Sequence, residues 1–262
     1  MDFQRIRLHI EDGVAELTLA RPEGANAIDL VAAHELAEAA LQCSSNPAVR
    51  AVLLRAEGRI FCAGGDVGSF REAGDDVGAA LQRITLGLHA AMSRFARMDA
   101  PVVAAVGGTA AGAGVSIAAA CDLVLASENA SFTMAYTRIG LSPDGSSTFF
   151  LPRRIGLGRT RDLLLRNRKL SAAEALAWGL VEQVVPADQL DEEARKVARE
   201  LASGPTAAYG LAKRLLLDTF DRGLETQMEM EARSIAEASA TDDGREGLRA
   251  FFEKRAPRFT GR

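Results

Sequence analysis

The stretch from residue 101 to residue 144 constrains the fold of this chain more than any other segment. It begins with Val102 to Val106, a short and wholly apolar run of the kind that forms a strand buried on both faces. Glycines follow at positions 107, 108, 112 and 114. Because glycine lets the backbone turn sharply and lets a ligand approach closely, the pattern predicts a buried strand that ends in a binding loop.

A short helix and a second strand are predicted after this loop. Residues 113–120 have room for about two helical turns, and the first N–H groups of a helix have no partner within it. Such N–H groups lie at the positive end of the helix dipole and suit a developing negative charge. A strand over 123–126 and a turn over 141–145 follow, and the turn offers one carboxylate, Asp144. A donor loop and a lone carboxylate indicate proton transfer beside a carbonyl.

Composition narrows the class of protein. The chain has 262 residues, of which 48% are hydrophobic and 25% charged, as in a globular protein with a sizeable core. A net charge of −4 argues against nucleic acid as a partner. We expect no membrane partner, because we find no signal-peptide core and no span flanked as a membrane helix should be. Cys43, Cys62 and Cys121 are few and widely spaced, which favours neither disulfides nor zinc and suggests the reducing cytoplasm.

The remaining elements divide the chain into a β/β/α body over 1–190 and a helical segment over 191–262. Asp12-Gly13 predicts a hairpin, Pro152 predicts a kink or helix end, and residues 74–78 read as a mobile polar loop. We expect strands at 5–10, 14–19, 51–55 and 181–185, and helices at 29–43, 81–97, 146–153, 160–165, 171–179, 190–202, 205–220, 224–240 and 243–254.

The histidines and the glycine motif do not by themselves indicate chemistry. His9, His34 and His89 adjoin no serine or cysteine motif, and we interpret them as surface or structural residues. Gly112-Ala-Gly114 resembles part of a dinucleotide-binding fingerprint, but the third glycine is missing and the following helix is short. Nucleotide binding of that type is therefore not predicted.

Two loops and one carboxylate remain as candidates. Ala63-Gly-Gly-Asp66 and Gly112-Ala-Gly114 each follow an apolar run, and each is either a tight turn or one donor of an oxyanion hole. Asp144 is either the N-cap of the next helix or a general base, and local sequence does not separate these two roles.

The motifs in combination resemble the crotonase superfamily, also called the enoyl-CoA hydratase/isomerase family. The resemblance covers nearly the whole chain. It is carried by Arg21-Pro-Glu-Gly-Ala-Asn-Ala27, Phe61-Cys-Ala-Gly-Gly-Asp66, residues 101–122, Gly140-Leu-Ser-Pro-Asp-Gly-Ser-Ser147 and residues 244–254. It implies an α/β fold, a ββα spiral with a helical C-terminal trimerisation segment, and a homotrimer or dimer of trimers. The implied ligand is an acyl-CoA thioester, with CoA as part of the substrate and no separate cofactor or metal.

The resemblance also assigns roles to individual residues. It places the oxyanion hole at the N–H groups of Gly65 and Ala113, with the thioester carbonyl between them. The final helix is expected near the CoA, against the body or a neighbouring subunit. The residues expected to bind substrate are Ala63, Gly64, Asp66, Gly112, Tyr136 and Lys254.

Departures from the family pattern decide which reaction is expected. Hydratases of the family carry two glutamates where this chain has Ser116 and Tyr136, and neither side chain is a suitable base at neutral pH. Asp144 falls where the family's Δ3,Δ2-enoyl-CoA isomerases and its phenylacetate-pathway ring isomerases place a single acid. We therefore predict an enoyl-CoA isomerase with Asp144 as acid/base, and expect Phe132, Tyr136 and Phe149 as candidate walls of the pocket. The alternatives are a ring isomerase, a weak hydratase and a non-catalytic acyl-CoA binding protein.

Overall fold

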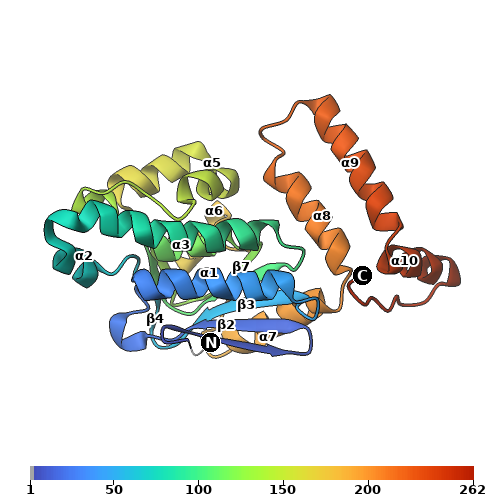
Figure 1. Ribbon diagram of the computed structural model, residues 1–262, viewed down its shortest axis with the longest axis horizontal. Helices are drawn as coiled ribbons and strands as arrows, with labels where there is room; N and C mark the ends of the chain where they lie inside the picture. Colours follow the sequence, from blue (N-terminus) through green and yellow to red (C-terminus); the bar gives the residue numbers. More distant parts are fainter. Residues whose placement is uncertain (1–2) are drawn as a thin grey trace.

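Two β-sheets form the framework of the body (Figure 1). The computed structural model describes residues 3–262. The larger sheet has the order β1-β2-β3-β5-β7-β10 and the smaller sheet the order β4-β6-β8-β9. The strands are β1 (Ile6–Glu11), β2 (Val14–Leu19), β3 (Ala51–Ala56), β4 (Ile60–Cys62), β5 (Val102–Val106), β6 (Thr109–Ala111), β7 (Leu123–Ser127), β8 (Ser131–Thr133), β9 (Leu170–Ser171) and β10 (Gln183–Val185).

Helices surround the sheets and extend beyond them. The α-helices are α1 (Leu30–Ser45), α2 (Val67–Ala73), α3 (Val77–Arg97), α4 (Ala113–Ala120), α5 (Ser147–Arg166), α6 (Ala172–Trp178), α7 (Leu190–Ala202), α8 (Thr206–Leu217), α9 (Leu224–Ser239) and α10 (Asp242–Glu253). Three short 3-10 helices, η1 (Pro22–Gly24), η2 (Gly74–Asp76) and η3 (Thr137–Ile139), complete the described elements.

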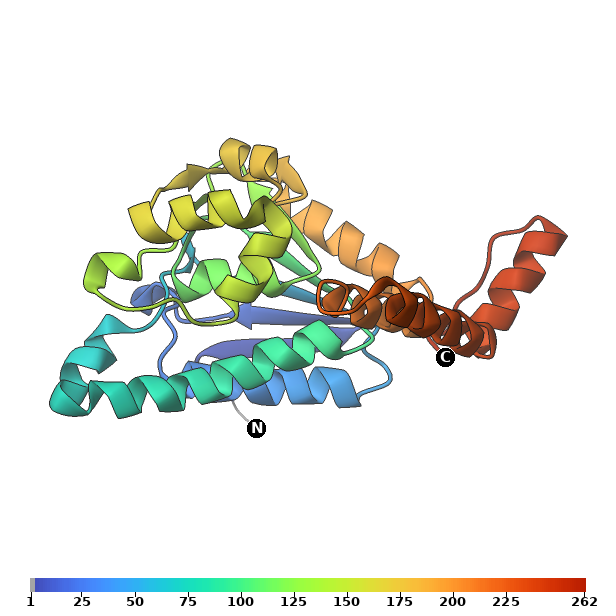
Figure 2. The ribbon, with the colours of Figure 1, turned by 90° about the horizontal axis from the view of Figure 1, so that it is seen from above.

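The central strands are buried on both faces, as their apolar runs predict. On β3, Val52 and Leu54 join the core that contains α1 and α3, while Leu53 joins a second core that contains α7. Alternate residues point to opposite faces because the side-chain period of a strand is two. Figure 2 shows α1 and α3 lying side by side along one face of the sheet. The α/β architecture expected from the sequence is confirmed, including the β1–β2 hairpin at Asp12-Gly13.

Two local predictions are corrected by the structure. Residues 74–78 are not a polar loop but η2 and the start of α3, which begins at Val77. The two helices predicted at 146–153 and 160–165 are both present within α5, but the break between them lies at Gly156 rather than at Pro152. Gly156 has φ 78°, a backbone conformation that glycine adopts readily and that interrupts helical geometry.

The chain after residue 190 begins with a helix that packs on the body. Helix α7 lies in the predicted C-terminal segment, but its Ala194 and Ala198 are buried against the larger sheet. The C-terminal arm, which we define as α8, α9 and α10, extends to one side of the body (Figure 1). Lys213 of α8 fixes the arm to the body through Asp122, at 2.7 Å, and through the carbonyl of Ala100, at 3.0 Å.

The arm carries large apolar side chains on its surface. Phe220, Phe251 and Phe252 are 70–78% exposed. No helix among residues 3–262 is long and apolar enough to cross a membrane. Trimerisation through the arm stays a prediction.

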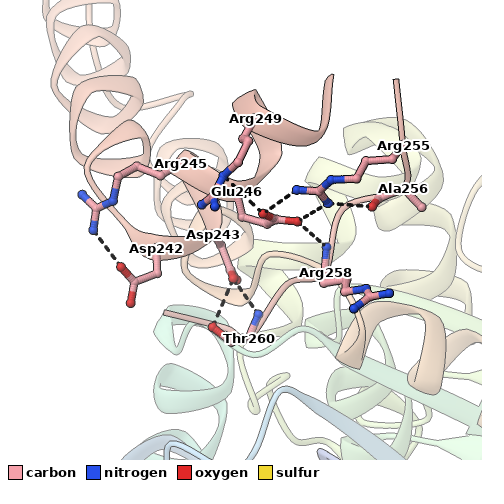
Figure 3. A pocket seen from close by; sticks show the side chains of 9 residues that line it. All are labelled: Asp242, Asp243, Arg245, Glu246, Arg249, Arg255, Ala256, Arg258 and Thr260. Atoms are coloured by element: carbon pink, nitrogen blue, oxygen red, sulfur yellow. Dashed lines mark hydrogen bonds and ion pairs between the residues drawn. The ribbon is translucent and has the colours of Figure 1, made fainter. Parts of the chain in front are cut away.

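The chain end folds back on α10 through a buried carboxylate. Asp243 is 2% exposed, and it accepts hydrogen bonds from the backbone N–H of Thr260, at 2.6 Å, and of Gly261, at 2.7 Å. Figure 3 shows Asp243 pointing at Thr260. Arg50 of the body also donates to the carbonyl of Phe259, at 3.1 Å. Residues 259–261 are therefore held by one carboxylate and one guanidinium.

Replacing Asp243 by alanine is predicted to release this tail. Hydrogen bonds to a charged group contribute about 1.5–3 kcal/mol each, and the substitution removes two such acceptors. We expect trypsin to cleave after Arg258 at least about tenfold faster, measured by mass spectrometry of the intact chain. Asp242→Ala is the matched control, because Asp242 is exposed and its carboxylate pairs with Arg245 on the same helix. Equal cleavage rates in the two variants would contradict this role of Asp243.

Candidate active site

A mostly apolar cavity of about 310 Å³ lies where the two glycine loops meet the turn that carries Asp144. Arg138 and Asp144 are the charged residues among the described side chains that line it. The lining also contains Ile28, Ala63, Gly64, Gly65, Val67, Phe70, Leu81, Ile84, Thr85, Leu88, Gly112, Ala113, Met134, Ala135, Tyr136, Ile139, Leu141 and Ser142. Segments far apart in the sequence therefore meet at one site.

The first loop follows β4 and presents one backbone N–H without a partner. The neighbouring N–H groups are bonded: Ala63 donates to Ala25, at 3.0 Å, and Asp66 donates to Ile28, at 3.0 Å. Gly64 donates to the Sγ atom of Cys62, at 3.4 Å. Within residues 3–262, no acceptor lies within hydrogen-bond reach of the Gly65 N–H. The loop is thus anchored on both sides of the one donor that lines the cavity.

The second loop follows β6 and presents another free N–H. Gly112 donates to Thr133, at 2.9 Å, and has φ 50° and ψ −119°, a conformation open to glycine but strained for other residues. Helix α4 then begins at Ala113, whose N–H belongs to the first turn and so lacks a partner within the helix. The described part of the chain supplies no other acceptor for it.

The two loops touch one another. A Cβ atom added to Gly64 would lie 3.6 Å from the amide nitrogen of Ala113, and one added to Gly112 would lie 3.6 Å from the Cα of Gly64. Gly64 itself has φ 100°. Two unpaired donors on touching loops therefore line one cavity, and backbone N–H groups placed in this way are able to stabilise developing negative charge on a bound oxygen.

Asp144 points its carboxylate at a tyrosine and does not cap the following helix. Its Oδ1 accepts a hydrogen bond of 2.5 Å from the hydroxyl of Tyr136. Helix α5 begins after Ser146 without a side-chain cap, and the N–H of Ser147 donates to the main-chain oxygen of Asp144, at 3.2 Å. The interpretation of Asp144 as an N-cap is therefore wrong, and its side chain is available to the cavity.

Tyr136 is a hydrogen-bond donor in this arrangement. Burial and the adjacent negative charge of Asp144 both raise the pKa of Tyr136 well above its usual value, because both disfavour the phenolate. The phenol therefore keeps its proton at neutral pH and donates it toward the carboxylate.

Two residues from other helices hold the turn that carries Asp144. The Oγ of Ser116 donates to the main-chain oxygen of Asp144, at 3.0 Å, and the Nε2 of His89 accepts from the N–H of Gly145, at 3.1 Å. The interpretation of His89 as a structural residue holds, but sequence reasoning missed its specific position behind the turn. Because 56 residues separate His89 from Gly145, no local pattern indicates this contact.

Four expected contributors lie elsewhere. The carboxylate of Asp66 caps α2 and pairs with Arg21, at 2.8 Å. Burial raises the pKa of Asp66, but the hydrogen bonds from Arg21 and from the backbone outweigh it, so the pKa is lowered overall. Lys254 ends α10, at the opposite end of the molecule from α2 (Figures 1 and 2). Phe132 is fully buried in the core, and Phe149 lies under the guanidinium of Arg153.

The walls of the cavity come instead from the helices after the first loop. Phe70 belongs to α2, and Leu81, Ile84 and Leu88 belong to α3. The apolar spacing over 81–88 predicts helix α3, but the side of that helix facing the site depends on how α2 turns the chain.

A wider hollow of about 820 Å³ lies between α10 and the C-terminal tail (Figure 3). Its charged side chains largely pair with each other: Arg255 with Glu246, at 2.6 Å, and Arg245 with Asp242, at 2.7 Å. It brings together none of the residues expected to act on a substrate. Across residues 3–262, no group of three or more His, Cys, Asp or Glu side chains is placed to hold a metal ion.

His89→Ala is predicted to loosen the Asp144 turn without unfolding the protein. Removing one neutral hydrogen bond costs about 0.5–1.5 kcal/mol, so the Gly145 amide should exchange with solvent deuterium about 2- to 13-fold faster. His9→Ala is the control, since His9 is an exposed residue of β1 remote from the cavity. Unchanged exchange at Gly145 in His89→Ala would show that this contact does not hold the turn.

Comparison with known proteins agrees with this geometry. A profile of the family described as enoyl-CoA hydratase/isomerase matches residues 9–262. A Rhodobacter capsulatus protein named "probable enoyl-CoA hydratase" is 39% identical over 262 residues, and the 1,2-epoxyphenylacetyl-CoA isomerase of Escherichia coli is 38% identical over 266 residues, each pair matching over 100% of both chains. The crystal structure of an enoyl-CoA hydratase from Bacillus anthracis superimposes with a TM-score of 0.92 at 32% identity, covering 99% of this chain and 100% of that one. The chain therefore belongs to the enoyl-CoA hydratase/isomerase family, the crotonase superfamily, and has its fold.

Proposed function

We propose that the protein is an enoyl-CoA isomerase, which moves a double bond of an acyl-CoA thioester by a 1,3-proton transfer. The observation that carries the proposal is the pairing of one carboxylate, Asp144, with two unpaired N–H groups in an apolar cavity. Among the described residues that line this cavity, Asp144 is the one acidic group. A reaction that needs a single acid/base is consistent with this one carboxylate.

The reaction follows from these groups. Asp144 takes a proton from C2 of a 3-enoyl thioester, and the electron pair of that C–H bond moves through the conjugated system onto the thioester oxygen. The N–H groups of Gly65 and Ala113 bind the oxygen of the resulting dienolate. Asp144 then returns the proton to C4, the carbonyl re-forms, and the double bond lies between C2 and C3. No atom is gained or lost, and the carboxylate ends ionised as it began.

Hydration is disfavoured by what occupies the two positions where hydratases of the family carry glutamates. Ser116 is fully buried, and a Cβ atom on Gly145 would lie 2.8 Å from its Cβ atom, so the Asp144 turn packs directly on this side chain. A longer side chain at 116 would have to displace the turn. Tyr136 is a protonated donor. Neither residue can activate a water as a base.

The oxyanion-hole donors are held in advance of the reaction. The first loop is fixed by backbone hydrogen bonds on both sides of Gly65, and the second by the Gly112 N–H before Ala113 and by helix α4 after it. The donors therefore need not reorganise as charge develops on the oxygen. Ala113 also lies at the N-terminus of α4, where the helix dipole favours negative charge. Such donors contribute about 10²- to 10³-fold each in other enzymes.

A ring isomerase is the second candidate, because the Escherichia coli relative that is 38% identical along the whole chain is named 1,2-epoxyphenylacetyl-CoA isomerase. The same carboxylate and donors would serve a cyclic acyl group. Assays with a linear 3-enoyl-CoA and with a cyclic acyl-CoA, run side by side, separate the two. Turnover of the cyclic compound alone would select the ring reaction.

Asp144→Asn is predicted to remove most of the activity. The amide is nearly isosteric and accepts a hydrogen bond from Tyr136, but it cannot take up and return a proton. We expect turnover of 3-enoyl-CoA to fall by at least about 10²-fold, the lower end for a positioned general base. Ser116→Ala, in helix α4 beside this turn, is the control and should cost far less.

Melting temperature and affinity for a saturated acyl-CoA should stay close to wild type in both variants. An Asp144→Asn protein that isomerises 3-enoyl-CoA at a near wild-type rate would refute the assignment of Asp144 as the acid/base.

The contribution of the Gly65 N–H is tested by two substitutions that share one steric effect. A Cβ atom at position 65 would lie 2.6 Å from the Cζ of Phe70, so Gly65→Ala measures that crowding while keeping the N–H. Gly65→Pro adds the loss of the N–H. We expect kcat of the proline variant to be about 10²-fold below that of the alanine variant, provided that circular dichroism shows both folded. Equal kcat values would exclude Gly65 as an oxyanion donor.

A further inference from the structure

The two carboxylate oxygens of Asp144 differ in their contacts, because the hydroxyl of Tyr136 bonds to one of them. Oδ1 accepts the 2.5 Å hydrogen bond from Tyr136, whereas Oδ2 has no partner among residues 3–262. Building on the proposed function, we infer that Tyr136 is a positioning residue. It fixes Oδ1 and thereby presents Oδ2 to the substrate as the oxygen that takes and returns the proton.

Without Tyr136, little else would fix the orientation of the carboxylate. Ser116 and Ser147 bond to the main-chain oxygen of Asp144, and His89 holds the next residue, Gly145. These contacts hold the backbone of the turn and do not engage the carboxylate oxygens. Among the described residues, the hydroxyl of Tyr136 is the group that forms a hydrogen bond with the carboxylate itself.

Tyr136 is itself held on a rigid segment. Its N–H donates to Met134, at 2.7 Å, and its carbonyl accepts from Leu141, at 3.1 Å. Helix η3 follows directly, and the hydroxyl of Thr137 fastens it to the carbonyl of Leu164, at 2.7 Å. The ring lines the cavity between this segment and the Asp144 turn. A donor fixed in this way can restrict the rotation of a neighbouring carboxylate.

The presence of tyrosine rather than glutamate at position 136 has two consequences. By resemblance, a glutamate occupies position 136 in the hydratases. A tyrosine there leaves no carboxylate at position 136, and it supplies a proton donor to Asp144. A glutamate at 136 would instead place like charge beside Asp144, which disfavours ionisation of both. The pair of Tyr136 and Asp144 is accordingly a unit suited to single-base proton transfer.

A double-mutant cycle with Tyr136→Phe and Asp144→Asn tests this inference. Phenylalanine keeps the ring and removes the hydroxyl. Loss of a hydrogen bond to a charged group predicts a fall in kcat of about 10- to 100-fold, with KM and the Kd of a saturated acyl-CoA unchanged within about twofold. Tyr209→Phe is the matched control: it is the other tyrosine of the chain and lies in α8, away from the cavity.

The combined variant distinguishes positioning from a general structural role. If Tyr136 acts through Asp144, adding Tyr136→Phe to Asp144→Asn should cause no further loss in kcat. Product is followed by NMR over days, so that slow variants stay measurable.

Near wild-type kcat in Tyr136→Phe, a parallel loss of binding or folding, or an additive loss in the combined variant would each overturn the inference. Loss of activity in Asp144→Asn with none in Tyr136→Phe would refute the role of Tyr136 alone. Full activity in Asp144→Asn would refute the proposed function and the inference that depends on it.

Discussion

The close contact between the loops after β4 and β6 is the constraint on which the rest of the site depends. Parallel pairing of these strands brings both loops to the same edge of the smaller sheet. The approach leaves no room for side chains, since a Cβ on Gly114 would lie 2.4 Å from the carbonyl oxygen of Cys62. The N–H groups of Gly65 and Ala113 stay unpaired in this arrangement, while those of Ala63, Asp66 and Gly112 donate to backbone carbonyls and fix the two loops.

The chemistry then depends on what faces these donors. Asp144 reaches the cavity from a turn held by Ser116 of α4 and His89 of α3, so both helices contribute to its position. The position that could supply a second carboxylate beside it holds Tyr136, which donates to Asp144. The cavity thus brings one carboxylate and two unpaired backbone N–H groups together between mostly apolar walls, which is what the proposed reaction requires.

Parts of this site are predictable from sequence because their causes are local. Glycines after apolar runs indicate the two loops, and the turn over 141–145 indicates Asp144. The resemblance to the family singles out Gly65 and Ala113 within those loops. The role of Asp144 as cap or base is not predictable in this way, because it depends on the direction of one side chain. The cavity walls formed by Phe70 and α3 are not predictable from the sequence either. Residues 74–78, which connect them, have the composition of a loop yet are helical. Pro152 predicts a break in α5 at its own position. The break lies instead at Gly156, whose positive φ interrupts the helix.

The central claim is that one carboxylate and two backbone donors move a proton between C2 and C4 without adding water. The most direct measurement is NMR analysis of the products formed from a linear 3-enoyl-CoA, and separately from a 2-enoyl-CoA, in D₂O. The account predicts interconversion of the two enoyl thioesters, with the proton carried between C2 and C4, little deuterium taken up from the solvent, and no 3-hydroxyacyl-CoA. Accumulation of 3-hydroxyacyl-CoA as the main product from either substrate would contradict it.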